Sequence, residues 1–146
     1  MERGYATENT HERQRLQALV ARVSDDDLTR QLPNGWTVAI TLAHLAFWDR
    51  HRLALVQRWE REGVTPAPAD ADTINEAVRI LAMALPPRTA AQLALDAAEA
   101  IDQTLEQLSA EMVTQIEVGG QASILRRAVH RRGHLDRIEH TLRAEL

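Results

Sequence analysis

The chain has 146 residues, of which 45% are hydrophobic and 26% are charged, so it fits one domain with its own core. Its formal net charge of −4 lacks the basic character of a nucleic-acid-binding protein. Cysteine is absent, which excludes disulfides and leaves only nitrogen and oxygen ligands for any metal ion. The N-terminus lacks the apolar stretch of a signal peptide and no run is long enough to cross a bilayer, so we expect a cytoplasmic protein without a membrane or nucleic-acid partner.

The first half of the chain predicts two long helices. Apolar residues recur at helical spacing from about residue 7 to residue 23. Residues 24–27 read as an N-cap followed by acidic residues, which favours a short helical turn before the break at 33–35. Thr37 is a natural N-cap for the next helix, which runs to about residue 62. This second helix is apolar on more than one side, which indicates a central and heavily buried element.

The second half begins with a proline-containing linker at 66–68 and a shorter helix over 72–84. Two prolines then suit the first turn of a helix over about 87–108. The brief alternation at 113–118 favours an extended connector. After two glycines, a last helix is expected over about 122–146.

Four substantial helices with short connections predict an all-α fold. We expect a four-helix bundle with one short extra helix, forming a single domain over residues 1–146.

The last predicted helix carries His130 and His134, which are four residues apart and therefore project from one face, one turn above the other. Such a pair can converge on one metal ion, although surface histidines at this spacing are also common. No glutamate follows His130, so the zinc-protease pattern with its general base is excluded.

His44 lies in the middle of the most apolar helix, between Ala43 and Leu45. A single buried histidine is usually a hydrogen-bonded core residue. Here a second helix already offers a histidine pair, and bundles build metal sites from ligands on facing helices. Three imidazoles suit Zn²⁺, Ni²⁺, Fe²⁺ or Cu²⁺ and leave coordination positions open. We therefore predict one divalent metal ion held by His44, His130 and His134.

Two segments strengthen this prediction through a resemblance. Residues 35–49, GWTVAITLAHLAFWD, resemble the second-helix signature of the DinB-like superfamily, and residues 130–139, HRRGHLDRIE, are similar to its last-helix signature. That group includes the metal-binding N-terminal domain of mycothiol-dependent maleylpyruvate isomerase and the bacillithiol transferases. The resemblance implies a four-helix bundle that is often a homodimer. It also implies a divalent ion, usually zinc or nickel, bound by His44, His130 and His134, and an activated thiol from a small cofactor such as mycothiol.

Further residues are candidates for substrate binding. Arg127 and Arg131 fall between the core stripe and the histidine face of the last helix, so they either pair with an acid or line a wet pocket that takes a carboxylate. Trp48 shares the face of His44 and is a candidate pocket wall, with core packing as the alternative. His51 lies two turns from His44, a rise of about 10.5 Å, which favours a place at the pocket mouth over ligation. Trp36 is expected to be structural.

The leading functional hypothesis is a metal-dependent thiol S-transferase that acts on an electrophilic small molecule. The alternatives are a metal-dependent hydrolase, in which water takes the place of the thiol, and a non-catalytic protein that binds a metal or ligand in a stress response. The residues do not identify a catalytic general base.

Overall fold

The computed structural model describes residues 3–144, and the regular elements of this part of the chain are all helices. In chain order the elements are α1 (Gly4–Arg22), α2 (Asp25–Leu28), α3 (Val38–Glu62), α4 (Ala71–Ala82), α5 (Pro87–Glu106), α6 (Ala110–Val118), the 3₁₀ helix η1 (Ala122–Leu125) and α7 (Arg127–Arg143). None of these described helices combines the length and apolar character needed to span a membrane. The predicted all-α fold is confirmed.

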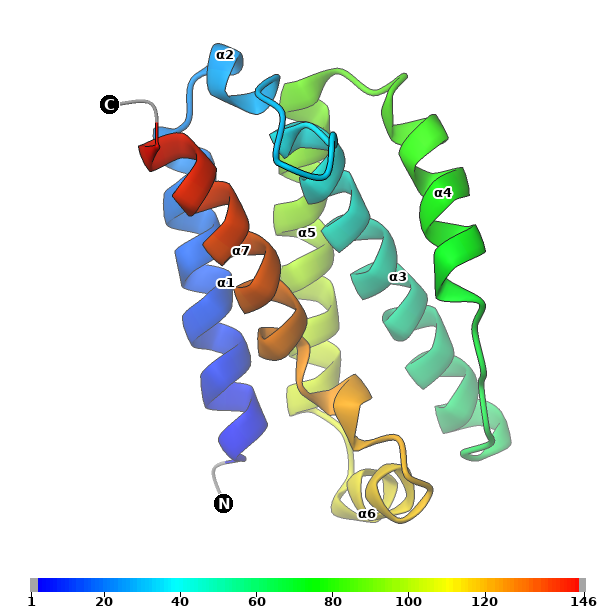
Figure 1. Cartoon of the computed structure of the whole chain (residues 1–146). Coiled ribbons are helices and arrows are strands. Elements are labelled where there is room, and N and C mark those ends of the chain that lie inside the picture. Colours follow the sequence, from blue (N-terminus) through cyan, green and yellow to red (C-terminus); the bar gives the residue numbers. More distant parts are fainter. Residues whose placement is uncertain (1–2, 145–146) are drawn as a thin grey trace.

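The four long helices α1, α3, α5 and α7 form the bundle (Figure 1). Helix α3 packs mainly on α5 and also contacts α7, while α1 packs on both α7 and α5. Helix α4 lies along the outer side of α3, and α6 crosses the end of the bundle opposite α2 (Figure 1). Helix α4 is the short extra helix that the sequence predicted, and α2 is the expected short helical turn, whereas α6 was not predicted.

The helix starts follow from local capping. The Thr37 hydroxyl accepts a hydrogen bond from the Ile40 N–H at 3.0 Å, which begins α3 where the sequence predicted. Ser24 and Asp27 form a reciprocal capping box that begins α2. Pro87 occupies the first turn of α5, where its missing N–H costs no helical hydrogen bond.

Two segments correct the sequence-based expectation. The predicted extended connector at 113–118 is wrong, because these residues belong to α6. Ser109 caps this helix by accepting from the Met112 N–H at 3.1 Å, and Ile116 is fully buried against the bundle end. The last helix begins at Arg127, since residues 122–125 form the tighter η1 and Arg126 leaves helical geometry with φ −105° and ψ 69°.

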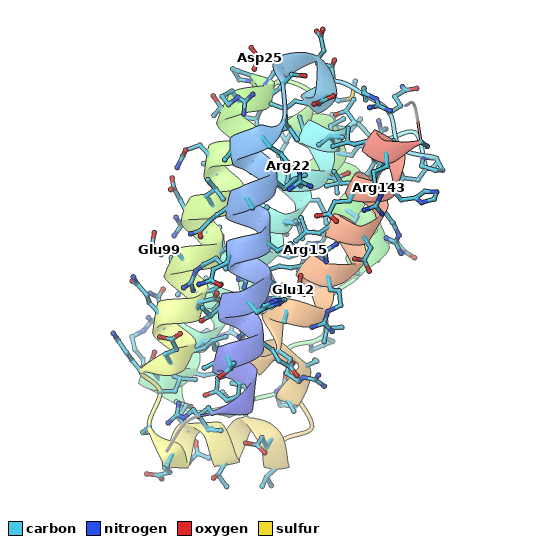
Figure 2. All side chains as sticks on the ribbon, turned by 90° about the vertical axis from the view of Figure 1, so that its left-hand side faces the viewer. Glu12, Arg15, Arg22, Asp25, Glu99 and Arg143 are labelled. Atoms are coloured by element: carbon cyan, nitrogen blue, oxygen red, sulfur yellow. The ribbon has the colours of Figure 1, made fainter. Side chains whose placement is uncertain are left out.

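A charged seam joins α1 to α7 along the face shown in Figure 2, where Glu12 and Arg15 project from α1 towards α7. Arg15 forms ion pairs with Asp136 at 2.6 Å and with Glu139 at 3.0 Å. The buried Glu12 accepts hydrogen bonds from Arg15 and Arg132, both at 3.2 Å. This seam fixes α7, which carries two of the three candidate ligands, against α1.

Candidate metal centre

The three histidines that the sequence singled out converge in the structure. His44 comes from α3, and His130 and His134 come from successive turns of α7. Their ring centroids form a nearly equilateral triangle, with separations of 5.1 Å for His44–His130, 4.7 Å for His44–His134 and 4.8 Å for His130–His134. One ligand nitrogen from each residue lies within 4.8 Å of the other two.

The environment keeps these histidines neutral. Burial, with the neighbouring His134, lowers the pKa of His44 to about 4. Burial also lowers the pKa of His134 to about 4, with a contribution from Arg137. The pKa of His130 falls to about 2, because burial is reinforced by the positive charge of Arg127. Neutral imidazole is the form that binds metals, so all three side chains carry a free lone pair at neutral pH.

The donor set fits a transition-metal ion. The Nε2 atoms of His44 and His130 are 3.1 Å apart, close to the spacing of about 3.3 Å between two ligands of tetrahedral zinc with Zn–N bonds of about 2.0–2.1 Å. Either a proton or a cation must lie between two such nitrogens. The buried Nδ1 of His44 has no hydrogen-bond partner among the described residues. Three nitrogen ligands without a carboxylate suit Zn²⁺, Ni²⁺, Fe²⁺ or Cu²⁺ and do not suit Mg²⁺ or Ca²⁺, which prefer oxygen.

A cavity of about 520 Å³ opens beside the three histidines. Its wall is built from the segment before α3, from α3 and α4, and from the start of α7. The lining residues are Asn34, Trp36, His44, Trp48, Arg52, Ala71, Asn75, Ser123, Arg126, Arg127, Val129, His130 and His134. The imidazole cluster therefore faces a space large enough for a small molecule. Within the described chain the cluster holds only these three ligand side chains, so an ion held there would take any further ligand, such as water or a reactant, from the cavity.

Trp48 and Trp36 form aromatic walls of this cavity. The Trp48 Nε1–H donates to the Asn75 side-chain oxygen on α4 at 2.7 Å, which fixes the indole and ties α4 to the pocket. The Trp36 ring packs edge-on against the His44 ring at a centroid distance of 5.2 Å. The expectation that Trp36 is only a structural residue is therefore incomplete, since its ring touches a candidate ligand.

Behind the histidines lies a buried network of ion pairs that joins all four bundle helices. Arg131, which is 1% exposed, donates to Asp102 on α5 at 2.8 and 2.9 Å and to Asp49 on α3 at 3.2 Å. Asp49 also accepts from Arg127 at 2.9 Å, and Asp102 accepts from Arg13 on α1 at 2.7 Å. Each buried carboxylate thus meets two guanidinium groups, which offsets its desolvation cost.

This network separates the two arginines that the sequence proposed for substrate binding. Arg131 is enclosed in the bundle and does not line the cavity. Arg127 pairs with Asp49 and also lines the cavity, where its Nη2 lies 3.3 Å from Nδ1 of His130. Sequence spacing placed both arginines near the pocket but did not distinguish the enclosed one from the accessible one.

Asn9 on α1 fixes the start of α7. Its side-chain oxygen accepts the Ala128 N–H at 2.8 Å, and its amide donates to the Leu125 carbonyl at 2.9 Å. Asn9 is 1% exposed, so both hydrogen bonds are shielded from water. They set the position of the first turn of α7, from which His130 projects one turn later.

His51 is not among the residues that line the cavity or form the histidine cluster. Its ring packs against Trp48 at 5.1 Å, and its Nδ1 lies 3.4 Å from the guanidinium of Arg52. Arg52 itself, which the sequence reasoning did not select, lines the cavity. Its guanidinium lies over the Trp48 ring at 5.1 Å. The spacing of four residues between Trp48 and Arg52 on one helix is the signal that points to this contact.

A comparison with protein families gives one match: the family model described as the DinB superfamily matches residues 8–137. The matched segment covers α1 through most of α7 and includes all three histidines. No curated protein and no solved structure matches the chain.

Proposed function

The chain belongs to the DinB superfamily, whose members often bind metal, and from that membership and the histidine geometry we propose that it binds one zinc or nickel ion through His44, His130 and His134. The observation that carries the proposal is the triangle of neutral imidazoles at the wall of a cavity. A protein shell of three ligands is typical of catalytic rather than structural sites, because a position is left for a reactant.

We propose further that the site acts as a thiol S-transferase on an electrophilic small molecule, with the thiol supplied by a small cofactor such as mycothiol. A divalent ion at the three histidines would supply a Lewis acid that lowers the pKa of a thiol or water reaching it from the cavity. Trp36 and Trp48 give the cavity aromatic walls, and Arg127 places positive charge beside His130, which favours a thiolate over a thiol. In the transfer, the sulfur forms a bond to carbon, the leaving group departs with its electron pair, and the thiol proton goes to solvent.

The transferase is tested with the zinc-loaded protein, a small thiol and 1-chloro-2,4-dinitrobenzene. The expected product is the thioether, formed with release of chloride and a proton. Its formation is measured by absorbance. The His134→Ala protein serves as the metal-deficient control. We expect turnover above the uncatalysed rate in the native protein and none in the variant. Equal rates in both proteins contradict the transferase proposal.

The same open position also supports the hydrolase alternative, in which water takes the place of the thiol. Ester hydrolysis that persists in the absence of thiol and disappears in His134→Ala favours that alternative. A protein that binds metal but catalyses neither reaction is a non-catalytic metal-binding or ligand-binding protein.

We also propose that the chain forms a homodimer. Helix α4 exposes apolar side chains at its C-terminal end, with Leu81 73% and Ile80 54% exposed, followed by Met83 at 62%. A contiguous exposed apolar surface of this kind is typical of a protein contact. Light scattering on the purified chain measures its mass directly.

A further inference from the structure

Arg52 differs from the other arginines of the cavity because it has no acidic partner among the described residues. It lies on α3, partly buried, with its guanidinium over the Trp48 ring at 5.1 Å. Among residues 3–144 its Nε is buried without a hydrogen-bond partner, and its Nη1 lies 3.4 Å from Nδ1 of His51. Among residues 3–144 no carboxylate forms an ion pair or hydrogen bond with Arg52.

The two other arginines of the cavity are paired. Arg126 bonds Glu8 at 3.2 Å, and Arg127 bonds Asp49 at 2.9 Å. The described residues that line the cavity include these three arginines and the three histidines, but neither aspartate nor glutamate. The cavity is therefore cationic in a chain whose net charge is −4. Any metal ion held by neutral imidazoles adds its full positive charge to the same space.

A partly buried guanidinium without an acid is costly unless another anion compensates its charge. Burial and the neighbouring Arg127 lower the pKa of Arg52, which shows that the surroundings disfavour the cation. Arginine nevertheless stays charged at neutral pH. Its planar donors match the two oxygens of a carboxylate or phosphate, and the indole of Trp48 holds the group in place from one side.

We propose that Arg52 is the anion-binding residue of this cavity and that the natural ligand is a small organic acid. Its carboxylate or phosphate binds Arg52, and its apolar part packs between Trp48 and Trp36. This inference rests on the proposed function in one respect: the anion enters the cavity in which the reactants would meet. Binding at Arg52 does not itself require the metal ion.

The test compares probes of similar shape and different charge: benzoate, phenyl phosphate and uncharged benzamide. Binding is followed by NMR from the indole N–H signals, because Trp48 and Trp36 line the cavity. Trp59 is buried in the apolar core, in one cluster with Ile101 and Leu105 of α5, and serves as an internal reference. We expect at least one anion to bind the native protein about 10-fold more tightly than benzamide, as expected for a charge-assisted contact.

Arg52→Gln should remove this preference, lowering the affinity for the anion about 10-fold while leaving benzamide unchanged. Arg52→Lys keeps the positive charge but loses the paired planar donors of the guanidinium group, so we expect an intermediate affinity for the anion. Arg50→Gln is the matched control: it removes the same charge from an exposed position on the same helix, outside the cavity, and should bind as the native protein does. Thermal unfolding of each variant confirms that it is folded.

Anion binding that is unchanged in Arg52→Gln, or benzamide binding as tight as anion binding, overturns the inference. Preference for benzoate or for phenyl phosphate identifies which oxyanion the site takes, and either supports it. The titrations are run on both metal-free and zinc-loaded protein, and the metal content of each sample is measured. A protein that takes up no zinc but still shows Arg52-dependent anion binding contradicts the proposed metal function and supports the anion site, so the two failures are distinguishable.

Discussion

Replacing Arg131 with glutamine tests whether the ion-pair network behind the histidines is structural. Arg131 donates to two oxygens of Asp102, to Asp49 and to the Asn9 carbonyl. After the substitution Asp102 keeps its contact with Arg13 at 2.7 Å, so its charge is only partly uncompensated. Removing one partner of a buried ion pair lowers the free energy of unfolding by about 3–5 kcal/mol, and because Arg13 remains beside Asp102 we expect a loss of about 3 kcal/mol here.

The free energy of unfolding is measured by urea titration with circular dichroism, on metal-free protein so that metal binding does not contribute. Arg137→Gln is the control on the same helix, because Arg137 is exposed, and its effect should stay within about 0.5 kcal/mol. Adding Asp102→Asn to Arg131→Gln should recover part of the loss, since it removes the uncompensated charge. A loss below about 1 kcal/mol in Arg131→Gln refutes this reading of the network.

Three further predictions concern pH, the start of α7 and assembly. Folding lowers the pKa of His44 and His134 from 6.5 to about 4, so protonation of these histidines favours the unfolded chain. The metal-free protein therefore keeps its stability above pH 6.5 and loses it as the pH drops from 6.5 towards 4. Between pH 7 and 5.5 the loss should be about 1 kcal/mol per histidine by urea titration, and a flat profile would contradict it. Asn9→Ala should lower the free energy of unfolding by about 2 kcal/mol, because the buried Ala128 N–H loses its acceptor. It should also weaken zinc binding by displacing the start of α7, and an unchanged zinc affinity in calorimetry would argue against that coupling. Leu81→Glu should convert a dimer to a monomer in light scattering, and a dimer that survives this change places the interface elsewhere.

The shared face of His130 and His134 was predictable because helical geometry alone relates these two residues. Residues four apart on a helix share a face, so His130 and His134 had to project together once the helix was assigned. The position of His44 in the most buried helix placed it inside the bundle, although its exact partner depended on how α3 meets α7. The resemblance over two motifs supplied that pairing, and the structure brings the three rings within 5.1 Å of one another.

The pairing of the arginines was not predictable, because it depends on residues far apart in the sequence. Arg131 meets Asp102 across 29 positions and Asp49 across 82. Whether an arginine of α7 is enclosed or faces the cavity depends on the rotation of that helix about its axis, which the sequence does not specify. Helix α6 was missed for a local reason. The brief alternation at 113–118 favours an extended segment, whereas the Ser109 cap begins a helix there.

The most direct test of the metal centre is the metal content of the untagged native protein, measured by plasma mass spectrometry beside His44→Ala and His134→Ala. The control is His140→Ala, because His140 is an exposed histidine on α7, the helix of His134, and is not part of the cluster. We expect about one equivalent of zinc or nickel in the native and control proteins, and its loss in both histidine variants. A native protein that contains no metal and takes up neither added zinc nor added nickel would contradict the proposed three-histidine site.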